Sequence, residues 1–133
     1  MGLKDCRVGA LMAVSDLDAA RRFYEDQLGL VPGEQEQEGV RYFCAEGTSL
    51  FVYLQPHNAG ASSATLAGWT VDDLDQTMDE LTSRGVHFEH YDQPGIKTDE
   101  RGVFDGGDFR AAWVKDPDGN TMAITQFSSS VVR

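Results

Sequence analysis

The chain has 133 residues, and its 11 basic and 22 acidic residues give a formal net charge of −11 at pH 7. That length is typical of one domain with one core. The acidity argues against nucleic acid or an anionic membrane as a partner, because each phosphate contact needs a Lys or Arg; it suits a cationic ligand, or serves solubility alone. With no apolar run near the ~20 residues that span a bilayer and no apolar N-terminal stretch, we expect a soluble, cytoplasmic protein with reduced cysteines.

The first half of the chain is predicted to form a strand, a helix and three further strands. Residues 11–14 are apolar, and Asp16 follows them with a carboxylate that suits the start of a helix. Gly29 stands where a left-handed residue would end that helix. The apolar face between them has helical spacing and consists of Leu17, Ala20, Tyr24 and Leu28, with Phe23 beside them. The strands are expected at about 30–36, 40–45 and 49–55, with a turn at 46–48.

The second half is predicted to repeat this order after a Gly-, Ala- and Ser-rich linker at residues 57–64. Asp73 is the expected helix cap, with Gln76 placed as in a capping box, and Gly85 the expected end. The apolar face comprises Leu74, Met78 and Leu81. Strands are predicted at 86–92, 109–115 and 121–127, separated by a long loop at 93–107 and a tight turn at 116–120. Residues 128–133 are expected to be frayed.

The two halves match as copies of one unit. Residues 11–18 align with residues 68–75, and the identical pairs are Val14/Val71, Asp16/Asp73, Leu17/Leu74 and Asp18/Asp75. The agreement extends over strand, cap, helix and terminal glycine, which are independent features of the pattern. We therefore predict an α+β fold with two βαβββ modules, at about 5–56 and 65–127, within a single domain that covers residues 1–133.

An ordered set of short motifs resembles the vicinal oxygen chelate superfamily, which includes glyoxalase I, extradiol dioxygenases and bleomycin-binding proteins. The motifs are residues 14–18 with Phe23-Tyr24 and Leu28-Gly29-Leu30, then residues 71–75, then Asp116-Pro117-Asp118-Gly119-Asn120. The resemblance covers nearly the whole chain. It implies that the modules form a cup-shaped mixed sheet of the glyoxalase/bleomycin resistance type, that ligands bind inside the cup, and that the chain pairs as a homodimer.

The resemblance also implies where a metal would bind, because the metal enzymes of this superfamily use His and Glu side chains from the first and last strands of each module. By their offsets from the motifs, the corresponding residues are Gly9, Leu66 and Ala123, with the fourth at Val52 or Tyr53. The first three and Val52 have no side-chain donor, and Tyr would be an unusual ligand. We therefore expect no metal and no other cofactor.

The three histidines offer no replacement for these ligands. His87 and His90 are three residues apart on a predicted strand, so they are expected to point to opposite faces and not to bind one ion together. His57 begins the linker. Each is interpreted as a surface residue.

Small and apolar residues at the metal positions favour an organic ligand held by hydrophobic and aromatic contact. Trp69 is expected to face the helix, because strand alternation gives Leu66 and Gly68 the cup face. The orientation of Trp113 is left open between core and pocket. The candidate ligand-binding residues are Gly9, Tyr42, Phe51, Tyr53, Leu66, Phe104, Trp113, Ala123 and Phe127.

Three functions fit the sequence. The favoured one is a metal-free protein that binds an aromatic or cationic small molecule, as drug-sequestering, antibiotic-resistance relatives do, with no catalytic residue assigned. The second is an enzyme, with a metal held elsewhere or none, which the resemblance would make a lyase, isomerase or oxidoreductase. Its candidate acids and bases are Tyr42, His90, Asp105 and Asp108. The third is a structural subunit whose cup is filled by its own side chains.

Overall fold

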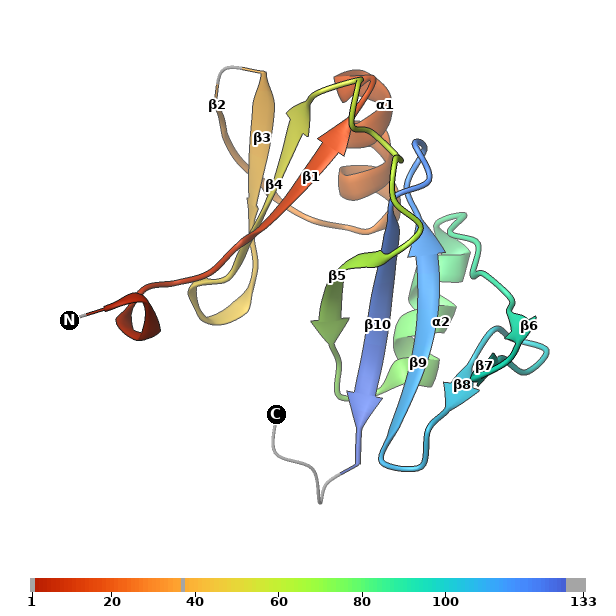
Figure 1. The fold of residues 1–133 in the computed structure, drawn as a ribbon. Helices are drawn as coiled ribbons and strands as arrows, with labels where there is room; N and C mark the ends of the chain where they lie inside the picture. Colours follow the sequence, from red (N-terminus) through yellow and green to blue (C-terminus); the bar gives the residue numbers. More distant parts are fainter. Residues whose placement is uncertain (1, 37, 129–133) are drawn as a thin grey trace. The chain divides into compact units, whose positions relative to one another are not determined.

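The computed structural model describes residues 2–36 and 38–128, which form two compact units (Figure 1). The first unit comprises residues up to Ser63 together with Asp116–Asn120, and the second comprises the rest of the chain from Ala64. The predicted frayed tail lies, from residue 129 on, outside the described residues. Within the described ranges, no helix is both long and apolar enough to cross a membrane.

The first unit has one mixed sheet with strand order β1-β4-β3-β2, in which β1 and β4 are parallel and the other pairs antiparallel. The Asp16 carboxylate accepts a hydrogen bond from the Ala19 amide at 3.0 Å, so the predicted helix cap is confirmed. The elements are η1 (Leu3–Asp5), β1 (Ala10–Val14), α1 (Leu17–Arg21), η2 (Arg22–Gln27), β2 (Pro32–Glu36), β3 (Gly39–Phe43), η3 (Ala45–Gly47) and β4 (Ser49–Leu54).

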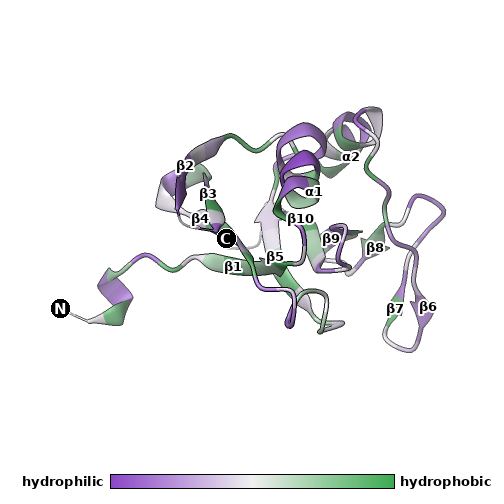
Figure 2. Ribbon diagram, turned by 90° about the horizontal axis from the view of Figure 1, so that it is seen from above, coloured by the Kyte–Doolittle hydropathy of each residue, from purple (hydrophilic) through white to green (hydrophobic). Residues whose placement is uncertain are grey.

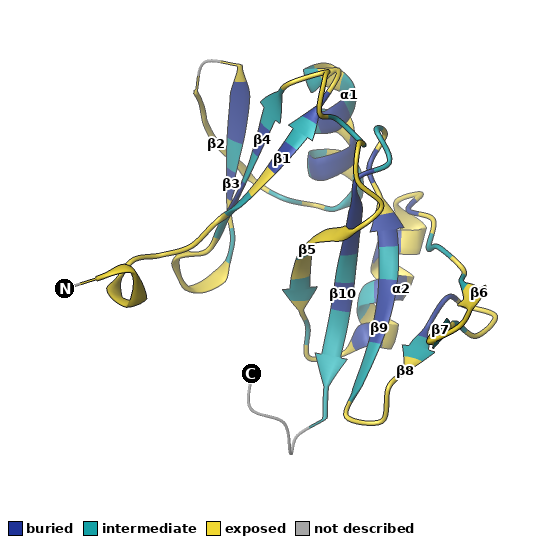
Figure 3. Cartoon of the chain, viewed as in Figure 1, coloured by how far each residue is buried: buried dark blue, intermediate teal, exposed yellow. Residues whose placement is uncertain are grey.

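The predicted first helix is interrupted. After α1 the backbone widens into the π-helical segment η2, where the Leu28 amide donates to the Phe23 carbonyl at 2.9 Å. Phe23 and Tyr24 are both buried there, and their rings meet edge to face. Gly29 then adopts a φ of 80°, the left-handed conformation expected at the helix end. The helix covers one face of the sheet, whose buried residues are Met12, Val14, Val40, Tyr42, Leu50 and Val52 (Figure 3).

The second unit repeats this plan with strand order β5-β10-β9-β8, where β5 and β10 are parallel. Asp73 caps its helix through the Gln76 amide at 3.0 Å, and Gln126 accepts a further bond from the Leu74 amide at 2.7 Å. β10 is largely hydrophobic, whereas β6 is hydrophilic and α2 carries many hydrophilic residues (Figure 2). The elements are β5 (Thr65–Thr70), α2 (Leu74–Ser83), β6 (Asp92–Gln93), β7 (Ile96–Lys97), β8 (Phe104–Asp105), β9 (Phe109–Lys115) and β10 (Thr121–Phe127).

The prediction of a strand at residues 86–92 is wrong. Only Asp92 enters a strand, the two-residue β6, which pairs with β7 in a hairpin around Gly95. The free edge of β9 is taken instead by β8, and the Glu89 amide reaches β9 only at the Trp113 carbonyl, at 2.9 Å. Residues 86–92 alternate as a strand would, but the segment has no partner strand along its length and therefore does not form one. The strands predicted at 109–115 and 121–127 are confirmed to the residue.

The turn Asp116–Asn120 between β9 and β10 packs with the first unit through a buried polar network. One Asp116 carboxylate oxygen accepts from the Tyr24 hydroxyl and from the Asn120 side-chain amide, each at 2.8 Å. The other accepts from the Asp118 and Asn120 backbone amides at 3.0 and 2.9 Å. Burial, followed by the nearby Asp116 charge, raises the pKa of Tyr24 above its ordinary value, so its hydroxyl remains a proton donor.

Candidate functional site

Each sheet has one face covered by its helix and one that its helix leaves uncovered, which we term the open face. In the first unit, strand alternation and register place Leu11, Arg41, Phe51 and Tyr53 on the open face. The Phe51 and Tyr53 rings stack with centroids 5.9 Å apart. The Arg41 guanidinium lies 4.8 Å from the Phe51 centroid, within the range of a cation–π contact.

The open face of the second unit carries a chain of touching aromatic rings, which we term the aromatic row: Tyr91, Trp113, Phe104, Phe109 and Phe127. Neighbouring centroids along it are 5.6, 6.4, 5.8 and 6.2 Å apart. These separations are typical of interacting aromatic pairs. All five side chains are partly exposed.

Small residues lie next to Trp113 on this face. Ala123 is its partner across the β9–β10 ladder, and Gly68 on β5 is in register with Ala123. Trp113 therefore belongs to the open face, which settles the orientation that the sequence left open. Trp69 pairs with the buried Ile124 on the helix side, as predicted. The arrangement is a partly exposed aromatic surface beside residues that leave space above the sheet.

The strand register also fixes the fourth position of the superfamily's metal ligands. Gly68 pairs with Ala123, and its repeat equivalent Leu11 pairs with Phe51, so the residue that corresponds to Ala123 is Phe51 and not Val52 or Tyr53. Phe has no donor atom. Across residues 2–36 and 38–128, no three His, Cys, Asp or Glu side chains come together in a way that could hold a metal ion. The residues present do not fit the metal site that the superfamily implies.

The predicted ligand-binding residues divide between the two units. Phe104, Trp113, Ala123 and Phe127 share the open face of the second unit, and Leu66, which is 42% exposed, lies on the same face by alternation with Gly68. In the first unit, Phe51 and Tyr53 share the open face, and Gly9 lines a cleft that is described below.

The prediction that Tyr42 lines a ligand site is wrong. Tyr42 is fully buried on the helix side of the sheet, where its ring stacks on Tyr24 and its hydroxyl donates to Glu25 at 2.8 Å. Arg21 forms an ion pair with Glu25 at 2.6 Å and is the main reason why the pKa of Glu25 is lowered. Burial, and then the bond to Glu25, raises the pKa of Tyr42. The side chain holds the helix on the sheet and cannot reach a ligand on the open face.

The other candidate acids and bases are engaged in local structure or lie at the surface. Asp105 accepts a hydrogen bond from the Gly107 amide at 2.9 Å in a tight turn. The His90 ring is 3.0 Å from the Glu100 carbonyl and is exposed, and it lies outside any strand, as does His87. Asp108 is exposed. These positions give no support to an acid–base pair.

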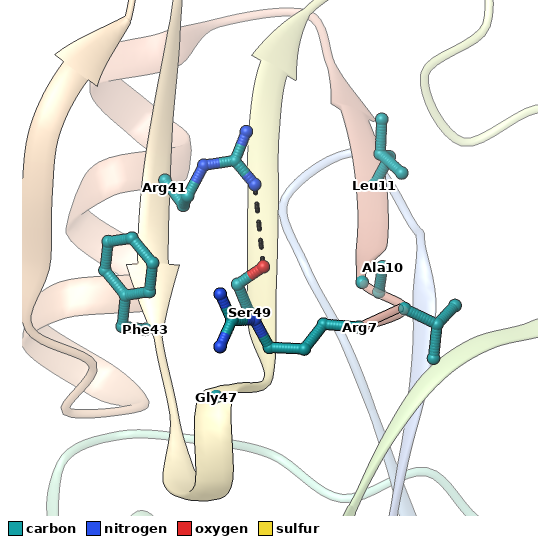
Figure 4. Close-up of a pocket in the computed structure, with 9 residues that line it drawn as sticks. Arg7, Ala10, Leu11, Arg41, Phe43, Gly47 and Ser49 are labelled. Atoms are coloured by element: carbon teal, nitrogen blue, oxygen red, sulfur yellow. Dashed lines mark hydrogen bonds between the residues drawn. The ribbon is translucent and has the colours of Figure 1, made fainter. Parts of the chain in front are cut away.

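Two features were missed from the sequence. Tyr91 and Phe109 complete the aromatic row, and Phe109 was detectable because the short turn sets it opposite Phe127. The second feature is a cleft of about 370 Å³ in the first unit, near the start of β1 (Figure 4). It is lined by Arg7, Val8, Gly9, Ala10, Leu11, Arg41, Phe43, Gly47 and Ser49.

Solved structures share this fold. A glyoxalase/bleomycin resistance protein from Catenulispora acidiphila has a TM-score of 0.67 and 25% identity, over 92% of this chain and 98% of its own. TnmS3, an antibiotic binding protein from a Streptomyces species, has a TM-score of 0.64 and 21% identity, over 92% and 95%. A glyoxalase/bleomycin resistance protein/dioxygenase from Alicyclobacillus acidocaldarius has a TM-score of 0.66 and 17% identity, over 96% and 95%. No curated protein matches the chain.

The sequence itself matches a family model over residues 8–124, which is most of the chain. The match covers most of both repeated modules and the whole turn at Asp116–Asn120. The two mixed sheets, each with its helix, agree with the fold of the solved relatives. The chain belongs to the Glyoxalase/Bleomycin resistance protein/Dioxygenase superfamily.

Proposed function

We propose that the chain is a small-molecule-binding protein that holds an aromatic organic ligand on the open face of the second unit, without a metal ion. The observation that carries the proposal is the aromatic row, which borders the small residues Ala123 and Gly68. Partly exposed aromatic rings are costly to leave in water, and a flat ligand that covers them removes apolar area from solvent. A few such rings can dominate the free energy of binding.

The ligand's body is expected to lie against Trp113, over Ala123. An Ala side chain opposite an indole leaves the ring face accessible, whereas a large residue would fill that space. The net charge of −11 attracts cations over long range, so an aromatic cation is expected to bind more tightly than a neutral compound with the same ring. TnmS3, a solved structure with the same fold, is an antibiotic binding protein, which supports a ligand-binding function for this chain.

Binding without catalysis is the function best supported by the superfamily's own ligand positions. By the resemblance to the superfamily, Gly9, Leu66, Ala123 and Phe51 correspond to the His and Glu ligands of the metal enzymes. A vicinal-oxygen reaction needs a bound cation with open coordination positions. None of these four residues has a side-chain donor for a cation, which supports binding without a metal-dependent reaction.

Trp113→Ala is expected to weaken binding of a fused-ring aromatic ligand by about tenfold or more, because truncation of a central aromatic contact typically costs over 1 kcal/mol. A thermal-shift screen of fused-ring aromatic cations and neutral compounds selects the ligand, and isothermal titration calorimetry then gives the dissociation constants. Trp69→Phe is the matched control, because Trp69 faces α2, and its effect is expected to stay within about twofold. No ligand in the screen, or equal effects of the two substitutions, would contradict the proposal.

A further inference from the structure

We propose that the cleft in the first unit is a binding site for the carboxylate of a small organic acid. The cleft lies where the segment before β1, the end of β3 and the start of β4 meet. It shares no residue with the aromatic row, and the inference does not rest on the function proposed for that surface.

Two arginines, Arg7 and Arg41, give the cleft a positive charge. Figure 4 shows the Arg7 side chain extended toward Phe43 and the Arg41 guanidinium directed to the same side of β4, with Ser49 between them. The Arg41 Nη1 lies 3.5 Å from the Ser49 hydroxyl oxygen. Its Nε donates to Glu36 at 2.8 Å, and its Cζ lies 4.8 Å from the Phe51 centroid. Glu36, Ser49 and Phe51 thus hold the guanidinium in place, while Nη2 and the second hydrogen of Nη1 can donate to a ligand.

Arg7 supplies the second guanidinium. Among the residues that the structure describes, no carboxylate lies close enough to form an ion pair with it. Its aliphatic stem crosses the backbone at Gly47, where a Cβ atom would lie 2.7 Å from the Arg7 Cδ. Gly9 likewise leaves room for Ser49, because a Cβ atom at position 9 would lie 3.0 Å from the Ser49 hydroxyl oxygen. The two glycines therefore leave the space that these polar groups occupy.

The charge of the cleft is opposite to that of the chain. The net charge is −11, yet the described lining contains two arginines and no Asp or Glu, and Glu36 pairs with Arg41 from outside it at 2.8 Å. A cation would meet the charge of Arg7 and the partly balanced charge of Arg41 there. A carboxylate would accept charge-assisted hydrogen bonds from both guanidinium groups, whose planar donor arrays match its two oxygens.

The rest of the lining is apolar and indicates an organic acid. Leu11, Phe43 and Val8 are 65%, 63% and 87% exposed, which is high for such side chains. A ring or short hydrocarbon attached to the carboxylate would cover part of this surface. Inorganic phosphate offers the same charge without that contact, so it is expected to bind more weakly than an aromatic acid.

Amide chemical shifts of the ¹⁵N-labelled protein test the inference with three probes: benzoate, benzylamine and inorganic phosphate. Benzoate is expected to shift the amides of residues 7–11 and 41–49, and benzylamine is expected to leave them unchanged. Arg7→Gln is expected to weaken benzoate binding by about tenfold, since it removes one charge-assisted pair. Arg22→Gln, which removes the same charge from an exposed site outside the cleft, is expected to change it less than about twofold.

Each contrary result overturns the inference. Absence of benzoate shifts up to its solubility limit would show that the cleft does not take a carboxylate. If Arg7→Gln and Arg22→Gln weaken benzoate binding equally, the binding depends only on the net charge of the protein and not on the cleft. If phosphate binds as tightly as benzoate, the apolar lining does not contribute and the site is not one for an organic acid. Trp113→Ala is expected to leave benzoate binding intact, so failure here and failure of the aromatic-ligand proposal are separate outcomes. The amide spectrum of each variant confirms that it is folded.

Discussion

Asp116→Asn is expected to lower the free energy of unfolding by about 3 kcal/mol, because two buried donors would lose their acceptor. The Asp116 side chain, in a residue only 5% exposed, accepts four hydrogen bonds from Tyr24, Asn120 and the turn backbone. An Asn side chain offers one oxygen and presents its NH₂ group to donors on the other side. Urea unfolding followed by far-UV circular dichroism measures the difference.

The matched control for this substitution is Asp108→Asn, which makes the same chemical change at an exposed residue. Its effect is expected to stay within about 0.5 kcal/mol. If the two variants unfold at the same urea concentration, the hydrogen bonds to Asp116 do not stabilise the turn. Some other interaction must then hold residues 116–120 against the first unit.

Gly60→Ala is expected to destabilise the protein by about 3 kcal/mol, more than the same substitution at Gly119. Both glycines have a positive φ, 65° and 89°, which costs an Ala residue about 1–2 kcal/mol. At Gly60 the new Cβ would also lie 2.0 Å from the Asp118 carbonyl oxygen, and a backbone atom cannot move aside cheaply. At Gly119 no atom of the described residues, apart from Gly119 and its two chain neighbours, lies within 4 Å of the added methyl group.

Thermal and urea unfolding of the two variants isolate the steric contribution, because the backbone strain is shared. Gly119→Ala is expected to show only the cost of strain. Equal losses would mean that the linker residue and the turn do not pack as described, since the close approach of Gly60 to Asp118 would then have no energetic consequence.

Local features of the fold could be predicted from the sequence. Asp16 and Asp73 cap their helices because a short carboxylate side chain can reach an amide three residues ahead wherever the backbone turns into a helix. The strands 109–115 and 121–127 were found because a tight turn separates two apolar runs. The segment 86–92 also has the alternation of a strand, but a strand needs a partner. The edge of β9 is occupied by β8, which lies more than ten residues further along the chain, and the local sequence of 86–92 does not indicate this.

The candidate site shows a similar division. Trp69 could be assigned to the helix side by counting from Gly68, since both belong to one strand. Trp113 required its pairing with Ala123 on another strand. Tyr42 was misassigned because neighbouring positions of β3 both carry aromatic or apolar side chains, and alternation alone does not say which set the helix covers. Its neighbour Phe43 is the exposed one, at 63%.

The acidic composition concealed the cleft. Net charge describes the average field of a protein and not the sign at one point on its surface. Arg7 and Arg41 come from different elements and are brought to one place by the pairing of β1 and β3 with β4. The sequence spacing of Arg7 and Arg41 does not indicate that the two side chains lie close together. For this reason the sequence predicted a cationic ligand and no anionic one.

Metal-free binding is tested most directly by titration of the aromatic ligand found by screening, before and after dialysis against a strong chelator, with elemental analysis of both samples. We expect no stoichiometric metal in the purified protein and the same dissociation constant in both titrations, because Gly9, Leu66, Phe51 and Ala123 supply no ligand for a cation. Stoichiometric metal whose removal abolishes binding would contradict this expectation.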